Sequence, residues 1–378
     1  MQRYIVSFSE NADEKKALEE NCTKICGCNN CAQPILIIFS SDTEGFEFYS
    51  RSLKSRFPSS TVIGCTTYSV FSSCGTASRG LSCLSVFDGI ECSSGVLLEI
   101  TRNPMKYRSC VTQALSSLSS YENNSYENTC CLEFTTALSR AEELVQDTLS
   151  DALSRTGIRT FGSSGGCMPS EKKTYVSLNG TVYDEACVFV LVHNTRGKIF
   201  LYRENIYSPT ANKFTATSVD CEERTVYEYN GRVAADVLSR ALTVPRDRLS
   251  EALFTHPMGR EIDGDIYITD FDRVNEDGSI SYFSRIYGYT KMILLEPDNA
   301  QRVWRETKSA VVNAVPNPSF SIAVNCESRT IFFERSGIFG DFVRNLGTYS
   351  GGFVGFSGYG EQLDFMHLNQ SLVLAVFE

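Results

Sequence analysis

Four cysteines near the N-terminus form the densest group of metal-ligating residue types in the sequence. They are Cys22, Cys26, Cys28 and Cys31. Four thiolates this close together could bind zinc or an iron–sulfur cluster. The single residue between Cys26 and Cys28 matches no common zinc motif, so a cysteine-rich segment without metal is the alternative interpretation. The metal content of a Cys26→Ser/Cys28→Ser variant, compared with that of the parent protein, would separate the two.

Nucleophilic catalysis would need a thiol or hydroxyl group beside a base. Cys65, in the sequence Gly-Cys-Thr-Thr, follows a predicted strand, where nearby main-chain N–H groups would activate an exposed thiol. The only histidines are His193, His256 and His367. No Gly-x-Ser-x-Gly pattern surrounds Cys65. We therefore predict no catalytic residue and no enzymatic activity, and keep a Cys65-dependent enzyme as an alternative.

Two glycine-rich stretches could contact a ligand through the main chain. They span residues 162–166 and 351–360. Neither matches GxxxxGK[ST] or a strand-linked GxGxxG. Glycine nevertheless lets a ligand approach main-chain N–H groups closely. Tight turns between strands are the alternative interpretation of both stretches.

Polar residues also stand directly before the last apolar run of the chain. Glu361 follows the second glycine stretch, and His367 and Asn369 come just before the apolar run 371–377. Polar groups in this position could converge on a pocket. The alternative is that Glu361 and His367 only hold their own loop in place by hydrogen bonds.

Composition excludes several classes of partner. The 378 residues contain 35 Lys and Arg and 45 Asp and Glu, for a formal charge of −10, with no basic run. Binding to nucleic acid or to an anionic membrane needs clustered positive charge, so neither is expected. No window reaches the ~18 apolar residues of a membrane helix, and the N-terminus does not resemble a signal peptide. We therefore predict a cytoplasmic protein with reduced thiols.

Strand and helix patterns alternate along the whole chain. Strands are predicted at 34–39, 61–64, 81–87, 95–101, 130–134, 186–192, 198–202, 226–229, 266–270, 280–283, 292–295, 320–324, 353–356 and 371–377. Helices are predicted after Asp42, and at 139–155, 233–242 and 300–314. The strands at 81–87 and 95–101 could pair with each other, and an Asp-Gly turn would join 266–270 to 280–283.

The mixture of helices and adjacent strand pairs predicts an α+β protein, in which each domain has a mixed, largely antiparallel sheet flanked by helices. Residues 103–129 are serine-rich and are predicted to form a disordered or insert-like loop. Residues 203–225 are polar and turn-rich, and we place a domain boundary near residue 218. The predicted organisation is a cysteine-containing segment (1–29), a first domain (30–218) and a second domain (219–378).

Several short motifs, in order, resemble those of FIST domain proteins. They are Val62-Ile-Gly-Cys-Thr-Thr67, Tyr227-Glu-Tyr-Asn-Gly-Arg-Val-Ala-Ala-Asp236, His256-Pro-Met-Gly259, Cys326-Glu-Ser-Arg329, and Gly355-Phe-Ser-Gly-Tyr-Gly-Glu361 with His367 and Asn369. The resemblance runs from about residue 30 to the C-terminus. It implies a FIST N-terminal domain followed by a FIST C-terminal domain.

The resemblance implies a sensory module that binds a small ligand, such as an amino acid or a similar metabolite. The signal would pass to a separate kinase, chemoreceptor or other signalling protein. The implied ligand site consists of Cys65, Thr66, Arg329, Gly358, Glu361, His367 and Asn369, with Arg329 pairing a ligand carboxylate or, alternatively, forming a structural ion pair.

Two other functions follow from the same resemblance. Some bacterial members bind haem and sense nitric oxide, which would make His367 the first candidate for a haem ligand. A eukaryotic branch recruits substrates in F-box proteins, so a protein-interaction module without a small ligand is the other alternative. Haem is the only cofactor that these readings suggest.

Overall fold

The computed structural model describes residues 2–28, 32–119, 121, 126–262 and 264–378, with the main chain alone at Cys28. The chain forms two compact units. The larger comprises residues 1–204, 304–367 and 372–378, and the smaller comprises residues 205–303 and 368–371. Helices accompany mixed or antiparallel sheets in both, which confirms the predicted α+β class. The linear boundary near residue 218 stays a prediction.

The larger unit repeats one arrangement three times: a strand, a helical crossover, and a second strand parallel to the first. The pairs are β2 (Leu36–Ser41) with β3 (Thr61–Thr66), β8 (Thr129–Thr135) with β9 (Arg159–Ser164), and β22 (Phe320–Cys326) with β23 (Gly352–Gly358). The crossovers contain α2 (Phe46–Arg56), α4 (Glu142–Leu153), and α8 (Glu327–Arg335) with α9 (Phe339–Gly347). Both strands of a parallel pair end at the same edge of the sheet.

Each parallel pair occupies the two central positions of its own six-stranded sheet. The first sheet has the order β1-β6-β2-β3-β10-β11, with β1 (Tyr4–Ser9), β6 (Leu81–Val86), β10 (Val176–Leu178) and β11 (Thr181–Tyr183). The second is β25-β24-β9-β8-β12-β7, with β25 (Met366–Leu368), β24 (Glu361–Leu363), β12 (Ala186–Asn194) and β7 (Ile90–Leu98). The third is β13-β26-β22-β23-β4-β5, with β13 (Ile199–Asn205), β26 (Ser371–Phe377), β4 (Val70–Ser72) and β5 (Gly75–Ala77).

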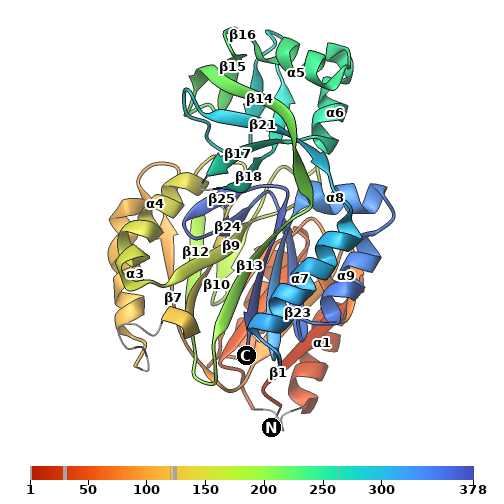
Figure 1. Cartoon of the computed structure of the whole chain (residues 1–378). Coiled ribbons are helices and arrows are strands. Elements are labelled where there is room, and N and C mark those ends of the chain that lie inside the picture. The colour runs from red at the N-terminus through yellow and green to blue at the C-terminus, as the bar shows by residue number, and fades with distance from the viewer. Residues whose placement is uncertain (1, 29–31, 120, 122–125, 263) are drawn as a thin grey trace. The chain divides into compact units, whose positions relative to one another are not determined.

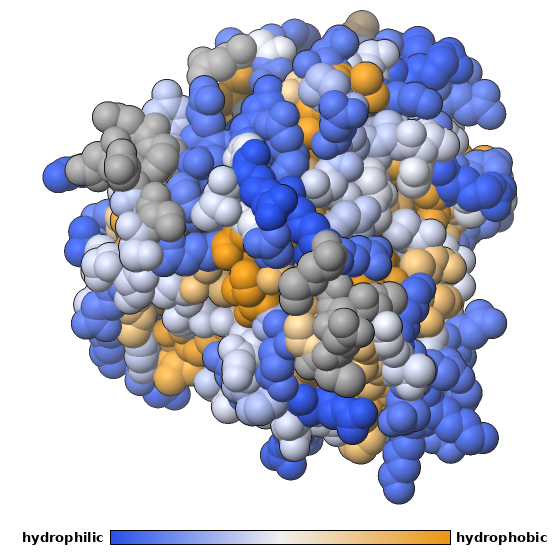
Figure 2. Space-filling model, turned by 90° about the horizontal axis from the view of Figure 1, so that it is seen from below, coloured by the Kyte–Doolittle hydropathy of each residue, from blue (hydrophilic) through white to orange (hydrophobic). Residues whose placement is uncertain are grey.

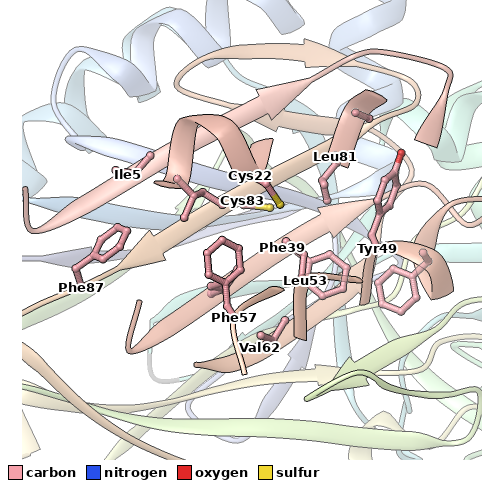
Figure 3. Close-up of a cluster of buried hydrophobic side chains, with 14 residues drawn as sticks. Ile5, Cys22, Phe39, Tyr49, Leu53, Phe57, Val62, Leu81, Cys83 and Phe87 are labelled. Carbon is pink, nitrogen blue, oxygen red and sulfur yellow. The ribbon is translucent and has the colours of Figure 1, made fainter. Parts of the chain in front are cut away.

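Apolar side chains fix the helices of the larger unit to these sheets. Besides the crossover helices they are α1 (Glu14–Cys28), α3 (Arg108–Ser116) and α7 (Ala300–Ala314). Beneath α1 and α2, residues such as Phe39, Tyr49 and Leu53 form one buried cluster (Figure 3). A second cluster, which includes Val145 and Leu149 of α4, lies beneath α3 and α4. Burial of each such side chain contributes about 1.5–3 kcal/mol.

The smaller unit is built on one antiparallel sheet with the order β18-β17-β21-β14-β15-β20-β19, and β16 pairs with β15. Its strands are β14 (Tyr207–Asp220), β15 (Thr225–Tyr229), β16 (Arg232–Val233), β17 (Met258–Ile262), β18 (Asp265–Thr269), β19 (Phe271–Val274), β20 (Ile280–Tyr282) and β21 (Lys291–Pro297). Its helices are α5 (Ala234–Leu242) and α6 (Leu249–Thr255), whose Leu238 and Leu253 are buried against the sheet.

The described residues also form short 3₁₀ turns at Pro104–Tyr107, Tyr126–Asn128, Ser154–Thr156 and Arg246–Arg248. Among those residues, no helix combines the length and the apolar character needed to cross a membrane. Figure 2 shows the molecule from below, where hydrophobic residues gather in separate patches between hydrophilic ones.

The predicted pairing of strands 81–87 and 95–101 is wrong. These segments become β6 and β7, which belong to different sheets; β7 is labelled in Figure 1. β6 pairs with β1 on one side and β2 on the other, whereas β7 pairs with β12. Both hydrogen-bonding edges of β6 are therefore occupied, and no edge remains for its neighbour in the sequence.

The two segments predicted to be irregular contain regular structure. Residues 103–129 include α3, because Val111 and Ala114 form a buried stripe that the serine-rich composition hides; residues 120 and 122–125 lie outside the described residues. Residues 203–225 contain the long strand β14, whose polar side chains are largely half-buried or exposed while its main chain pairs with β15 and β21.

The predicted turn at 275–278 exists, but it joins different strands. It connects β19 to β20, and Gly278 has the positive φ of 84° that favours glycine. The strand predicted at 266–270 is β18, which pairs with β17 instead. The N-terminal segment 1–29 was predicted only as a cysteine-containing segment. It contains the strand β1 and the helix α1.

Candidate functional site

The carboxyl ends of the three parallel pairs meet and hydrogen-bond to one another. The Tyr68 N–H, just after β3, donates to the Ser357 carbonyl of β23 at 2.9 Å. The Ser164 N–H of β9 donates to the Gly360 carbonyl, just after β23, at 2.9 Å. The Gly166 N–H, just after β9, donates to the Thr66 carbonyl of β3 at 2.8 Å. These three bonds close a ring of strand ends.

Two glycines allow the strand ends to approach this closely. A Cβ atom on Gly166 would lie 2.0 Å from the Ser357 carbonyl oxygen. A Cβ atom on Gly358 would lie 2.0 Å from the Ser164 carbonyl oxygen. Because main-chain atoms cannot move aside as a flexible side chain can, any other residue at either position would push the strand ends apart. Both glycine-rich stretches of the sequence therefore help to build the ring.

Buried polar side chains surround the ring, and we call them the strand-end cluster. Each is at most 6% exposed. The cluster consists of Thr66, Thr67, Ser163, Ser164, Glu327, Thr330, Ser357 and Gln362. Ligands of α/β proteins bind outside the carboxyl ends of parallel strands, because main-chain groups and loop side chains converge there. The cluster has the position and the polarity of such a site.

Most of the cluster is hydrogen-bonded within itself. The Thr67 hydroxyl accepts from the Ser357 N–H at 2.7 Å, and the Thr330 and Ser357 hydroxyls lie 2.9 Å apart. Gln362 donates from Nε2 to the Ser164 hydroxyl at 2.8 Å, and the same nitrogen lies 3.4 Å from His367 Nδ1. These bonds fix the orientation of the side chains before any ligand binds.

Two acceptor atoms of the strand-end cluster differ from the rest. Within the described part of the chain, Glu327 Oε2 and Gln362 Oε1 are buried and have no hydrogen-bond donor. Leaving a buried acceptor unsatisfied costs about 1–3 kcal/mol. The two unsatisfied acceptors therefore lower the stability of the folded protein. A ligand that donates hydrogen bonds to them would restore the lost stability.

Glu327 is an acidic residue of the strand-end cluster. It is the first residue of α8, directly after β22, and is 6% exposed. Burial raises the pKa of its carboxyl group to about 8, although a hydrogen bond from the main chain of Cys167 opposes the shift. The free carboxyl group therefore holds a proton over much of the neutral pH range.

Two further side chains, those of Cys167 and Tyr68, lie close to Glu327, and a third, that of Tyr359, contacts Cys167. Cys167, which follows β9, is buried, and its thiol lies 3.7 Å from the Tyr359 hydroxyl. Tyr359 follows β23 and Tyr68 follows β3, and both are half-buried. Burial, a hydrogen bond to Glu334 and the charge of Glu327 together raise the pKa of Tyr68 to about 12. The pairs β2–β3 and β8–β9 therefore each place a side chain near Glu327, which itself follows β22 of the third pair.

Four residues predicted from the sequence lie at this ring. Thr66 and Gly358 are part of it. Glu361 is buried on β24 and pairs with Ser163 of β9, and His367 reaches the cluster through Gln362. Cys65 precedes Thr66, but it is fully buried, and burial raises the pKa of its thiol. It lacks the exposure that a nucleophilic cysteine needs.

Arg329 has a different environment. Its guanidinium group forms an ion pair with Glu204, and both side chains are at most 1% exposed. The same group lies 4.9 Å from the centre of the Phe333 ring and 5.3 Å from that of Phe342. The structural ion pair, which was the alternative interpretation of Arg329, is present. Its role toward a ligand carboxylate stays a prediction.

Asn369 and His256 belong to the smaller unit. Asn369 accepts from the Asp270 N–H at 3.3 Å, and His256 Nδ1 lies 2.9 Å from the Thr255 hydroxyl. His193 is in the larger unit, away from the strand ends, with Nδ1 2.8 Å from the Thr129 hydroxyl. His367 is thus the histidine that the structure places beside the strand-end cluster.

Of the four N-terminal cysteines, Cys31 lies outside the described residues, and Cys28 is described by its main chain alone. Cys22 points into the apolar cluster beneath α1, beside Cys83, and Cys26 packs against the same cluster (Figure 3). Burial raises the pKa of Cys22 to about 11, which opposes the thiolate form that binds metal. Among the residues described, no three His, Cys, Asp or Glu side chains are grouped as metal ligands.

Two open cavities of the larger unit lie elsewhere. One, of about 540 Å³, lies between α1 and α2, where Arg51, Arg56 and Glu19 line it. Another, of about 450 Å³, lies between α9 and the β4–β5 hairpin. Both are bounded largely by exposed side chains on the surface, without the buried, oriented polar groups that mark a specific ligand site.

Glu327, Gln362 and Cys167 were not predicted as site residues. Glu327 lies inside the Cys326–Arg329 motif, directly after an apolar run, and this position at the end of a buried strand was the available signal. Gln362 stands next to the predicted Glu361. Cys167 gave no signal, because only the folding of β9 against β23 brings it close to Tyr359.

Comparison with known families agrees with the motifs. The FIST N domain model matches residues 35–232, and the FIST C domain model matches residues 234–364. No curated protein matches the chain. Since the FIST N match alone covers more than half of the sequence, the resemblance is confirmed: this chain belongs to the FIST family.

Proposed function

We propose that this protein is a sensor that binds a small polar ligand at the strand-end cluster. FIST domains are associated with signal transduction and small-ligand sensing, and act as sensory modules rather than as catalysts. The observation that carries the assignment to this place is the pair of buried acceptors, Glu327 Oε2 and Gln362 Oε1, which no described donor satisfies. An amino acid or a similar metabolite has the size and polarity for such a site.

The residues proposed to contact the ligand are those at the ring. Thr66, Gly358, Glu361 and His367 are retained from the sequence, and Glu327 and Gln362 are added. Cys65, Arg329 and Asn369 remain predicted ligand residues whose contacts within the protein are now known. We also propose that the signal leaves through a separate partner, such as a kinase or a chemoreceptor, and that the protein acts in the cytoplasm without catalysing a reaction.

A screen of metabolites by thermal shift, followed by calorimetric titration of each hit, tests the site. We expect His367→Gln to weaken a hit at least tenfold, because the substitution disturbs the Gln362 side chain that orients the cluster. His193→Gln is the matched control, since His193 is equally buried in the same unit, away from the strand ends. Equal affinity in both variants and in Thr66→Val would place the ligand elsewhere.

The surroundings of His367 do not fit haem. A haem ligand needs a ring nitrogen that opens onto an apolar slot. His367 is 5% exposed, and Gln362, Ser164 and Glu361 near it are polar and buried. These neighbours support a polar ligand, and an absorption spectrum recorded after haem addition checks the alternative.

A further inference from the structure

The strand-end cluster also indicates the charge of its ligand. Glu327 is buried, and within the described part of the chain its Oε2 atom receives no hydrogen bond. The basic residue nearest to Glu327 in the sequence is Arg329, and its guanidinium group forms an ion pair with Glu204 instead. Among the described residues, no basic side chain forms an ion pair with Glu327. Its carboxyl group is therefore buried in the neutral form, and the charged form would need a positive partner.

The second unsatisfied atom points to the same chemistry. Gln362 Oε1 is an acceptor, like Glu327 Oε2. A ligand that donates hydrogen bonds can satisfy Gln362 Oε1 and the ionised form of Glu327, and a ligand that carries positive charge favours that ionised form. Anionic ligands, such as phosphates or carboxylates without an amine, would keep Glu327 in its protonated, neutral form and would form no ion pair with it.

Tyr68, an aromatic residue near Glu327, is compatible with an organic cation. Tyr359 contacts Cys167, whose main chain binds the Glu327 carboxyl group, and Tyr68 lies close enough for the charge of Glu327 to affect its hydroxyl. Aromatic faces attract alkylammonium groups. A metal ion is a poorer fit, because among the described residues no three acidic, cysteine or histidine side chains are grouped as ligands.

We propose that the strand-end cluster binds a ligand that carries a protonated amine, and that Glu327 pairs with its ammonium group. This inference rests on the proposed ligand site and deepens it by naming the chemical class of the ligand. Glu327 is then a binding residue at the carboxyl end of β22, and the ring of strand ends holds it in place.

Binding of an amine should release a proton from the protein. In the free protein the pKa of Glu327 is about 8, so at pH 7 its carboxyl group is mostly protonated. The ammonium group favours the carboxylate, so binding expels that proton. Affinity should therefore rise about tenfold per pH unit between pH 6 and 8 and then level off.

Other titratable groups lie near Glu327 or near its neighbours and must be distinguished from it. The charge of Glu327 acts on Cys167, after β9, and on Tyr68, after β3. Glu171 acts in turn on Cys167, Glu334 and Arg335 act on Tyr68, and Tyr359 contacts Cys167. Burial raises the pKa of both Cys167 and Tyr68, so neither loses its proton between pH 6 and 8. Loss of the pH dependence in Glu327→Gln would assign it to Glu327.

The test uses the full chain and a panel of primary amines, which includes amino acids. Each amine is compared with its N-acetyl derivative, and neutral and anionic metabolites are also tested. Calorimetry in buffers of different ionisation enthalpy measures affinity and proton release. We expect some amines to bind with release approaching one proton at pH 7, N-acetylation to abolish binding, and Glu327→Gln to lower affinity at least tenfold. Asp341→Asn, the same change on exposed α9, should have no effect.

The outcomes separate this inference from the proposed function. If the hits are neutral or anionic compounds that need His367 but not Glu327, the ammonium assignment is wrong and the sensor site stands. If N-acetyl derivatives bind as tightly as the amines, the assignment is also wrong. If no compound of any class binds, both proposals fail. Circular dichroism of Glu327→Gln confirms that a lost affinity is not lost folding.

Discussion

Two buried glutamates of the larger unit, Glu133 and Glu327, differ in what surrounds them. Glu133 lies in the middle of β8 and is fully buried, yet Gln146 Nε2 donates to it at 2.7 Å, and Thr135 and Cys187 contact its other oxygen. Glu327 lies at the carboxyl end of β22, and Oε2 has no donor among the described residues.

Burial alone does not distinguish the two residues. It raises the pKa of Glu133 to about 7 and that of Glu327 to about 8, against an ordinary value of 4.5. The two residues differ in the hydrogen bonds that their carboxyl oxygens accept. Both oxygens of Glu133 accept hydrogen bonds inside the sheet. One oxygen of Glu327, at the strand ends, accepts none from the described residues. Unsatisfied hydrogen-bonding capacity, more than a shifted pKa, is what marks a candidate binding residue.

A third buried acid, Glu204, extends the comparison to a fully paired carboxylate. We expect Glu204→Gln to destabilise the protein by about 3–5 kcal/mol, because it leaves the Arg329 guanidinium group buried without its partner. Urea unfolding followed by circular dichroism measures the loss. A Glu204→Leu/Arg329→Met variant should recover most of it, and a single variant as stable as the parent would show that the pair contributes little.

Glu327→Gln should have the opposite effect and stabilise the protein. The pKa of Glu327 is raised on folding, so the folded state is favoured while the group is protonated, and stability falls as the pH rises from 4.5 through 8. An amide does not titrate, so the variant should gain on the order of 5 kcal/mol above pH 8 and almost nothing below pH 4.5. Urea unfolding at pH 5 and pH 8.5 measures the gap.

The matched control for this gain is Asp341→Asn, because Asp341 pairs with Arg344 on the exposed surface. It should change stability by less than about 0.5 kcal/mol at either pH. A destabilised Glu327→Gln at pH 8.5 would mean that the carboxylate has a partner in the folded protein, and the contrast with Glu133 would disappear.

Glu133→Gln should show the smallest effect of the three. The amide removes the cost of burying a charge above pH 7, but it also gives up acceptance from Thr135 and Cys187. Two lost hydrogen bonds of about 1 kcal/mol each offset most of the gain, so we expect a net change within about 1 kcal/mol at pH 8. A gain equal to that of Glu327→Gln would show that the two sites do not differ.

Local patterns in the sequence identified many of the elements but few of the contacts between them. The helix at 300–314 and the strands around Ile37, Val62 and Val324 follow from apolar periodicity, which depends on the chain itself. Helix α3 was missed because its buried stripe is short and its composition is serine-rich. The partners of β6 and β7 were missed because strand pairing depends on distant segments.

The site was predicted in part for the same reason. Thr66, Gly358 and Glu361 stand at the ends of apolar runs beside glycines, a pattern visible in the sequence. The two acceptors left without donors, Glu327 Oε2 and Gln362 Oε1, could not be seen there, since the hydrogen-bond count of an atom depends on every neighbour. The ion pair of Arg329 with Glu204, 125 residues away, is equally non-local.

The sequence by itself determined the α+β class, the family and the glycine-rich strand ends, because these depend on short patterns of residue type. Only the tertiary structure decided that three parallel pairs meet in a ring, that Arg329 is paired, and that Glu327 is buried without a donor on Oε2. The reason is physical: periodicity and turn chemistry act between near neighbours, whereas burial and hydrogen-bond saturation are set by segments that meet only in the folded chain.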